Sequence, residues 1–206
     1  MARVHTTAFN ETDCIGDCYE PINNSLDNLD TAVQNLSASV IDYTKVASGM
    51  VLNCVNVFTN TAVTYNGIAN TETEIAALST TITPKLNTSK ILIQAMINGE
   101  GYHDAVYRLR RFVGGTDQGL LGNAVTAGSR NTGISPMPYD VDNTSTMTNS
   151  YIQFYDTPGT TSPVTYRFYF RPAGATPFHL NRSVTDTDNN VCERASSSVT
   201  LLEIKG

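Results

Sequence analysis

Apolar residues near the N-terminus stand alternately four and three positions apart, and polar residues fill the positions between them. This spacing returns an apolar side chain every 3.5 residues, which is the heptad pattern of a coiled coil. Because the intervening residues are mostly Asn, Ser, Asp, Thr and Gln, only a narrow seam can be buried. We therefore predict a helix over about residues 22–45 that packs on copies of itself. The seam residues are Ile22, Leu26, Leu29, Val33, Leu36, Val40 and Tyr43.

The positions that flank this seam favour three helices over two. In the heptad register the g positions are Ser25, Ala32 and Ser39, which are small and uncharged. Parallel dimers usually carry opposed Glu and Lys at the flanking positions, whereas small residues let helices approach closely and bury more than the seam. The alternative is a single amphipathic helix that lies on its own domain. We expect a homotrimer.

From residue 50 onward the apolar pattern changes to a period of two, which is typical of strands. The run 91–97 is the most apolar and predicts a central strand, and Asn66-Gly67 predicts a hairpin turn. Residues 114–149 are rich in Gly, Asn, Ser, Thr and Pro and predict long surface loops. The strand-like runs cover residues 50–58, 62–65, 74–84, 91–97, 105–113, 150–155, 164–171 and 198–204.

Short strands separated by turn signals, with no second helix, predict an antiparallel β-sandwich, and we expect the jelly-roll arrangement. The sequence then divides into an N-terminal docking arm over residues 1–20, a coiled-coil helix over 21–47 and a β-sandwich head over 48–206. The abundance of Thr, Asn and Ser, with only 16% charged residues, agrees with a mostly β protein that has a hydroxyl-rich surface.

Charge and hydropathy exclude several partners. The formal net charge of −6 argues against nucleic acid, because phosphate binding needs concentrated Lys and Arg. The N-terminus has no apolar signal segment, and no stretch approaches the roughly 20 apolar residues of a membrane span. We expect a protein that is soluble where it is made and does not insert into membranes.

The sequence offers little support for a metal or cofactor site. Cys14 and Cys18 are one residue too far apart for the usual redox pair, and no His pair completes a zinc site. Whether these two thiols are bonded to each other stays open. The run that starts at Asp186 begins like a calcium loop, but Val191 and Ser197 stand where an EF-hand needs Gly and Glu. We expect no cofactor and leave open a loop calcium ion.

Enzymatic activity is not expected either. No two carboxylates have a spacing that forces them onto one side of a cleft, and the chain has no Trp and no Gly-x-Ser-x-Gly motif. Aromatic residues in predicted loops can stack on sugars, so they are candidate ligand contacts, with packing at a trimer axis as the alternative role. These residues are Tyr102, His103, Tyr139, Phe178 and His179.

Six short runs of the strand region carry a family likeness: Ile82–Pro84, Ser89–Ile93, Tyr107–Arg110, Asp156–Gly159, Thr165–Tyr166 and Thr200–Ile204. Together they resemble a β-sandwich module of bacteriophage fibre and virion-surface proteins, especially those of marine and cyanobacterial phages. The likeness covers about residues 46–206, and the segment from Tyr19 to Leu36 resembles the helical stalk entry of such proteins.

This resemblance implies a homotrimer of jelly-roll heads set on a stalk, with residues 1–20 attached to another virion protein. The expected function is that of a trimeric fibre or spike of a phage virion, made in the host cytoplasm and involved in attachment to a host glycan or protein. One alternative is a capsid decoration protein, either a cement or a head-fibre protein, with no receptor role. Another is a polysaccharide-binding or depolymerising tail spike.

Overall fold

The computed structural model describes residues 24–32, 41–137 and 146–206, and the chain divides into two units, Met1–Asp42 and Tyr43–Gly206. In the first unit, residues 24–32 form an α-helix in which Leu26 and Leu29 are 57% and 59% exposed. The predicted docking arm over residues 1–20 lies outside the described residues. The same holds for four seam residues, Ile22, Val33, Leu36 and Val40.

The helix predicted over residues 22–45 does not continue to its expected end. Residues 41 and 42 are not helical, and Tyr43–Lys45 form a separate 3-10 helix, η1. This segment is held by the end of the chain instead, because the Lys205 ammonium donates to the carbonyls of Thr44 and Val46. Tyr43, the last seam position, lies below the Lys85 ammonium at 5.6 Å from its ring centre. The role of the seam in trimerisation stays a prediction.

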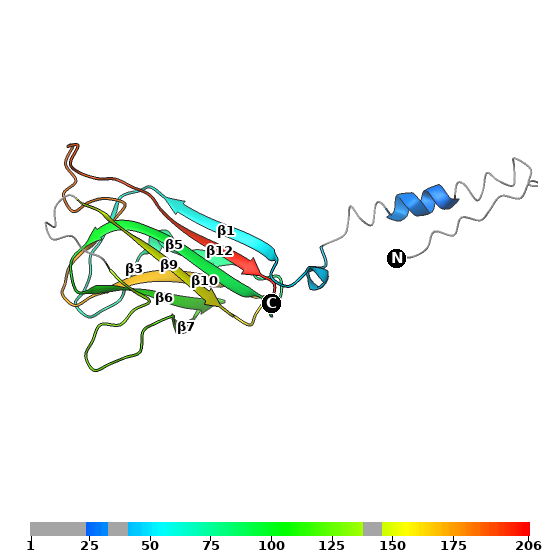
Figure 1. The fold of residues 1–206 in the computed structure, drawn as a ribbon, viewed down its shortest axis with the longest axis horizontal. Helices are drawn as coiled ribbons and strands as arrows, with labels where there is room; N and C mark the ends of the chain where they lie inside the picture. The colour runs from blue at the N-terminus through cyan, green and yellow to red at the C-terminus, as the bar shows by residue number, and fades with distance from the viewer. Residues whose placement is uncertain (1–23, 33–40, 138–145) are drawn as a thin grey trace, which may run out of the picture. The chain divides into compact units, whose positions relative to one another are not determined.

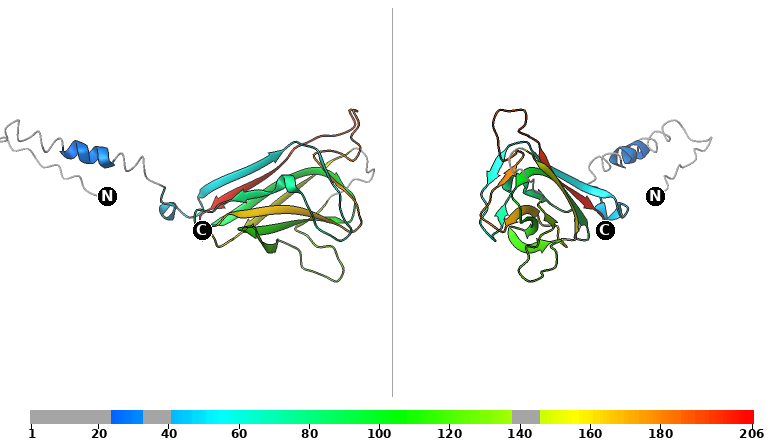
Figure 2. Two further views of the ribbon diagram at one scale, coloured as in Figure 1. Left: turned by 180° about the vertical axis from the view of Figure 1, so that it is seen from behind. Right: turned by 60° about the vertical axis from the view of Figure 1, so that its left-hand side comes forward.

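Two sheets make up the second unit (Figures 1 and 2). Sheet A contains β1 (Val51–Thr59), β2 (Val63–Tyr65), β5 (Lys90–Gly101), β9 (Thr148–Asp156), β11 (Phe178–Leu180) and β12 (Ser197–Ile204). Sheet B contains β3 (Thr73–Glu74), β4 (Thr80–Ile82), β6 (Ala105–Val113), β7 (Thr116–Leu121), β8 (Ser135–Pro136) and β10 (Val164–Pro172). A short 3-10 helix, η2 (Ala76–Leu78), connects β3 to β4.

The strand order is that of a jelly roll. In sheet A, β1 pairs with β12, β12 with β5, and β5 with β9, while β2 and β11 continue the positions of β1 and β12 along the far part of β5. In sheet B, β10 lies between β6 and the interrupted strand β3–β4, and β7 and β8 pair with the other edge of β6. The strand pairs described above are all antiparallel, so the predicted antiparallel sandwich is confirmed.

Alternation along the strands explains why the sheets face each other. In β10, Val164, Tyr166, Phe168 and Phe170 are buried while the residues between them are partly exposed. The run 91–97, predicted as a central strand, forms most of β5, which lies in the middle of sheet A. Burying a large apolar side chain contributes about 1.5–3 kcal/mol, so these two strands supply much of the core.

The connections differ from the sequence expectations at three places. Asn66-Gly67 does not close a hairpin, because β2 belongs to sheet A and β3 to sheet B. Gly67 instead allows close packing, since a Cβ there would lie 2.8 Å from Phe170 Cε2. Residues 114–149, where long surface loops are expected, contain the loop between β7 and β8 but also these two strands, and the sequence does not predict β11.

A buried asparagine lies where two neighbouring strands are interrupted. β1 ends before β2 begins, and β11 ends before β12 begins, at the same point along β5. Asn181 is fully buried and has a φ of 60°, a left-handed conformation in which β11 cannot continue. Its Nδ2 donates to the carbonyls of Thr59 and Thr61, both at 3.0 Å, and its Oδ1 accepts from the Ser197 hydroxyl at 2.6 Å. One side chain therefore joins the four strand ends.

One end of the sandwich holds the chain entry and the C-terminus, and the other end holds the long connections. The chain enters the second unit beside its C-terminus, where the Gly49 N–H donates to the Lys205 carbonyl at 2.9 Å. The opposite end carries the connections over residues 66–72, 102–104, 173–177 and 181–196 (Figure 1). Any contact made by the loops at that end is therefore far from the point where the chain enters the head.

Candidate functional site

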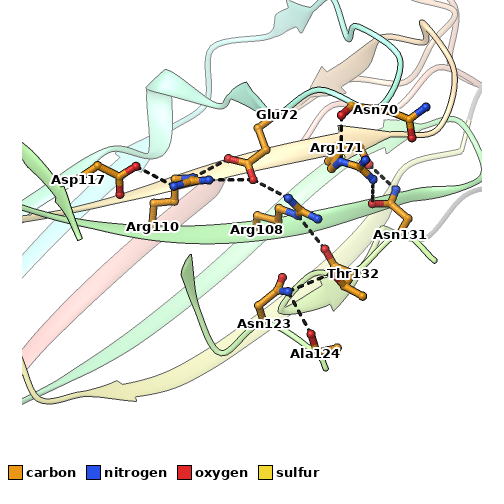
Figure 3. Close-up of polar contacts among 10 residues, drawn as sticks. All are labelled: Asn70, Glu72, Arg108, Arg110, Asp117, Asn123, Ala124, Asn131, Thr132 and Arg171. Carbon is orange, nitrogen blue, oxygen red and sulfur yellow. Dashed lines mark hydrogen bonds and ion pairs between the residues drawn. The ribbon is translucent and has the colours of Figure 1, made fainter. Parts of the chain in front are cut away.

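The outer face of sheet B carries the largest charged cluster that we found among the described residues. Arg108 and Arg110 point outward from β6, and both guanidinium groups converge on Glu72 from the segment before β3 (Figure 3). Arg108 Nη1 and Arg110 Nε each lie 2.6 Å from a Glu72 carboxylate oxygen. Arg110 also contacts Asp117 of β7 at 2.7 Å, so one carboxylate joins two arginines and a second extends the chain of charges.

The cluster is only partly exposed, and this shapes its electrostatics. The exposed fractions of the Glu72, Arg108 and Arg110 side chains are 16%, 14% and 25%. Burial alone would raise the pKa of Glu72, but the hydrogen bonds from Arg110 and Arg108 outweigh it and hold that pKa below its ordinary 4.5. The hydrogen bond to Glu72 likewise raises the pKa of Arg110. These groups therefore stay charged and paired at neutral pH.

The other arginines of this face are also engaged. Arg108 Nε donates to the Thr132 carbonyl at 2.7 Å, and Arg171 donates to Asn131 Oδ1 at 2.5 Å and to the Asn70 carbonyl at 3.1 Å (Figure 3). The Arg167 guanidinium stacks on the Phe112 ring at 4.2 Å. These guanidinium groups hold loops onto the sheet. Because their donors already bind groups of the same chain, they are poorly suited to binding phosphate.

A second polar cluster joins the two sheets at one margin of the core. Arg111 points inward from β6, and its Nη1 lies 2.8 Å from Oδ1 of Asp156, at the end of β9. The Tyr166 hydroxyl donates to Asp156 Oδ2 at 2.7 Å. Burial and the adjacent Asp156 charge raise the pKa of Tyr166, so its hydroxyl remains a donor. This arrangement holds the two sheets together. Asp156 is buried by these contacts, so its carboxylate is not accessible to a substrate.

Glu203 is a fully buried carboxylate with a structural role. Its Oε1 accepts from the backbone N–H of Lys85 at 2.6 Å and of Leu86 at 3.2 Å, and from the Ser89 hydroxyl at 2.7 Å. Three donors on one oxygen fix the β4–β5 turn against β12. Like Asp156, this acidic group stabilises the fold and does not face a cleft.

The residues predicted to contact a ligand from loops are not gathered at one site. Phe178 and His179 lie in β11 and are 0% and 7% exposed, so their placement in an exposed loop is wrong. Phe178 packs edge-on against Tyr107 with ring centres 5.9 Å apart. The ring of His179 lies 3.1 Å from the Thr64 hydroxyl, and burial lowers its pKa from 6.5.

The remaining predicted ligand contacts divide between a turn and a segment that the structure does not describe. Tyr102 is half-buried and His103 is exposed in the β5–β6 turn, where His103 Nδ1 lies 2.8 Å from the Asp104 carboxylate. Tyr139 lies outside the described residues. Two neighbouring aromatic residues on one turn form a small surface rather than an enclosed pocket.

The loop that begins like a calcium site is occupied by its own arginines. Asp186 pairs with Arg194 through two contacts of 2.7 Å and lies 3.4 Å from Arg182. An open hollow of about 380 Å³ lies beside them, and its lining includes Asp186, Arg194 and Cys192. Over residues 24–32, 41–137 and 146–206, no three His, Cys, Asp or Glu side chains are placed to hold a metal ion.

The described cysteines and helices add little functional signal. Cys54 is an exposed free thiol and Cys192 is a partly exposed one, while Cys14 and Cys18 lie outside the described residues. No helix in the described segments has both the length and the apolar character needed to cross a membrane.

No family model matches the chain, and no curated protein matches it. Several solved structures show a partial likeness in fold. The VP2 subviral particle of infectious bursal disease virus has 10% sequence identity and a TM-score of 0.39, over 81% of this chain and 43% of that chain.

Structures of the Gt and Gx strains of the same virus have 9% and 11% identity and TM-scores of 0.39 and 0.37. They cover 81% and 82% of this chain, and 42% of the viral chain in each case. The protein thus spans less than half the length of the chains that it resembles.

Proposed function

We propose that the protein is a structural component of a phage virion, a homotrimeric fibre or spike whose N-terminal residues attach to the particle. In this proposal the jelly-roll head projects outward and takes part in host attachment. The observation that carries it is the heptad seam placed directly before a jelly-roll head, a sandwich architecture that recurs in viral capsid proteins. A seam of about 33 Å is too short to hold three chains alone, so the heads must also associate.

The polar chemistry of the head supports a structural role over an enzymatic one. Asp156 and Glu203 are buried and hydrogen-bonded within the chain, and Glu72 is neutralised by two arginines. A glycosidase needs two carboxyl groups on either side of a bound sugar. None of these three carboxylates is available for that chemistry, so we infer that the protein is not an enzyme.

A second candidate is a capsid decoration protein with no receptor role. The observation that favours it is the burial of Phe178 and His179, which removes two of the aromatic residues expected to meet a ligand. Both candidates share the trimer and the particle attachment, and they differ only in whether the head binds the host.

Light scattering on the purified full chain tests the shared part of the proposal. We expect a mass three times the 22.3 kDa of one chain, and a Leu29→Asp variant should dissociate more readily because the charge enters the seam. A monomeric wild-type protein contradicts the proposal. Cross-linking Lys45 in intact particles should then yield adducts with a neighbouring virion protein.

Competition for host cells separates the two candidates. If the head binds a receptor, cells incubated with purified protein should adsorb fewer phage particles than untreated cells. Unchanged adsorption at saturating protein, together with particle labelling, favours the decoration role.

A further inference from the structure

The outer face of sheet A is nearly free of charge. Among the described residues that alternate outward from the four long strands, Lys90, at the start of β5, is the one exposed Lys, Arg, Asp or Glu side chain. Glu100, near the other end of β5, is 1% exposed and accepts from the Val184 N–H, so it does not reach the surface. The outward residues of this surface, here called the uncharged face, are Val51, Cys54, Asn56, Phe58, Lys90, Leu92, Gln94, Met96, Asn98, Asn149, Tyr151, Gln153, Tyr155, Ser198, Thr200, Leu202 and Ile204.

Strand register arranges these side chains in rows across the sheet. Phe58 is the strand partner of Ser198, Ser198 that of Met96, and Met96 that of Tyr151. These side chains therefore lie in one row across the sheet. Four positions along the strands, Leu92 and Tyr155 lie in another row with Leu202. Phe58, Tyr151 and Tyr155 are 62%, 58% and 52% exposed, so the aromatic residues of both rows face solvent in the single chain, while Leu92 between them is 9% exposed.

A polar row separates the two apolar rows and is already ordered. Asn56 Nδ2 donates to the Thr200 hydroxyl at 2.8 Å, and Gln94 Nε2 donates to the Tyr151 hydroxyl at 2.9 Å. The Tyr151 hydroxyl in turn donates to Gln153 Oε1 at 3.4 Å. Holding these side chains in place before contact reduces the entropy lost on association.

The size of the uncharged face fits a contact that adds to the heptad seam and does not hold the trimer alone. Four strands about 4.8 Å apart and about eight residues long cover an area of roughly 19 by 26 Å, or about 500 Å². A closed trimer cannot bury this face flat against the same face of one neighbour, because such a contact has two-fold symmetry. Three such faces turned toward a three-fold axis bury about 1,500 Å² in total, or about 500 Å² at each pair of heads, so the heads and the heptad seam must hold the trimer together. A hollow of about 480 Å³ beside Lys90, Tyr155 and Ile204 gives a partner side chain room at one end.

We propose that the uncharged face is the surface through which the head binds a second copy of the same chain. The chain carries a net charge of −6, so copies repel each other in general, yet this face presents no carboxylate to its partner. Amide and hydroxyl groups both donate and accept hydrogen bonds, which makes the polar row complementary to the same kind of surface on another copy. The inference rests on the proposed trimer and names where its heads meet.

The outer face of sheet B is a poorer surface for this contact. Its arginines and carboxylates are paired within the chain, and covering them would remove water from several charges with no new partner. The uncharged face has no such penalty apart from Lys90 at its end. The lower cost of desolvation therefore favours the outer face of sheet A as the contact surface.

Introducing charge at the centre of the uncharged face is the direct test. Met96→Lys and Gln153→Glu, each in the full chain, should raise the dissociation constant of the assembly at least tenfold, as measured by light scattering over a dilution series. Thr165→Lys, on the outer face of sheet B, is the matched control and should leave it unchanged. Near-ultraviolet circular dichroism checks that each variant is folded.

A thiol measurement tests the same face without placing a charge on it. Cys54 lies on the face, so in a chain with Cys14, Cys18 and Cys192 replaced by Ser it is the only thiol. We expect a maleimide to label Cys54 at least tenfold more slowly at concentrations where the protein is assembled than after dilution to monomer.

The outcomes separate the inference from the proposed function. A trimer that persists in both charge variants and labels rapidly at Cys54 overturns the inference and leaves the trimeric virion protein standing. A monomeric wild-type chain overturns both. Slow labelling that does not change on dilution also overturns the inference, because it means that residues 1–42 of the same chain, and not a second copy, cover the face.

Discussion

The two outer faces of the sandwich come from the same alternation of inward and outward residues, yet their chemistry is opposite. On sheet B the outward residues include Arg108 and Arg110, which share Glu72. On sheet A the corresponding positions hold Met96, Gln94 and other uncharged side chains. On sheet B the charged groups find their partners within the same chain. On sheet A large aromatic side chains remain in contact with water.

This difference shows that a β-sandwich can divide stability and association between its faces. Charged groups that are paired internally stabilise the fold and discourage contact, because covering them is costly. Apolar and amide groups contribute little while they remain exposed, and they gain only when a partner removes their water. Substitutions on the two faces should therefore affect different measurements.

The largest expected effect is on the folding of the chain and comes from the charged face. Glu72→Ala leaves Arg108 and Arg110 partly buried without their carboxylate, so we expect the free energy of unfolding in urea to fall by about 2–3 kcal/mol. Asp117→Ala, whose side chain is 42% exposed, is the control and should cost under about 1 kcal/mol. Equal small losses would show that the pairing on this face does not stabilise the fold.

The next effect should appear in association and not in folding. Phe58→Ala removes a ring that is 62% exposed in the single chain, so the dissociation constant of the assembly should rise about tenfold, equivalent to about 1.4 kcal/mol. Val125→Ala, which truncates a side chain that is 90% exposed outside the uncharged face, should change nothing. If both variants assemble like the wild type, Phe58 is an isolated surface residue.

The smallest effect is a dependence of stability on acid pH that belongs to the charged face alone. The pKa of Glu72 is lower in the folded chain than its unfolded value of 4.5, so protons bind the unfolded chain more readily. Its contribution is complete above pH 4.5 and is lost as the pH falls through the folded pKa. The difference in urea stability between wild type and Glu72→Gln should therefore shrink on acidification below pH 4.5, and a constant difference would contradict this account.

Sequence patterns predicted the long strands because their signal is local. The alternation over residues 105–113 and 164–171 coincides closely with β6 and β10, where every second residue packs between the sheets. In contrast, β11 has only Phe178, His179 and Leu180, too few residues to display a period. The sequence pattern therefore predicts a loop there, although Phe178 is fully buried in the core.

The candidate surfaces were harder to predict because they depend on residues that are distant in the sequence. Glu72 is separated from Arg108 by 36 residues and from Arg110 by 38, so no spacing rule connects them. Asn66-Gly67 predicts a hairpin turn because Asn-Gly is a strong local signal. The actual role of Gly67, allowing close packing beside Phe170, arises only when the two sheets come together.

By itself the sequence determined the mostly β fold, the heptad seam and the acidic net charge, because periodicity and composition are properties of neighbouring residues. The tertiary structure decided which strands share a sheet, where Asn181 joins the interrupted strands, and which outer face keeps its charges paired. These features follow from strand register, and register is set by packing between segments that meet only in the folded chain.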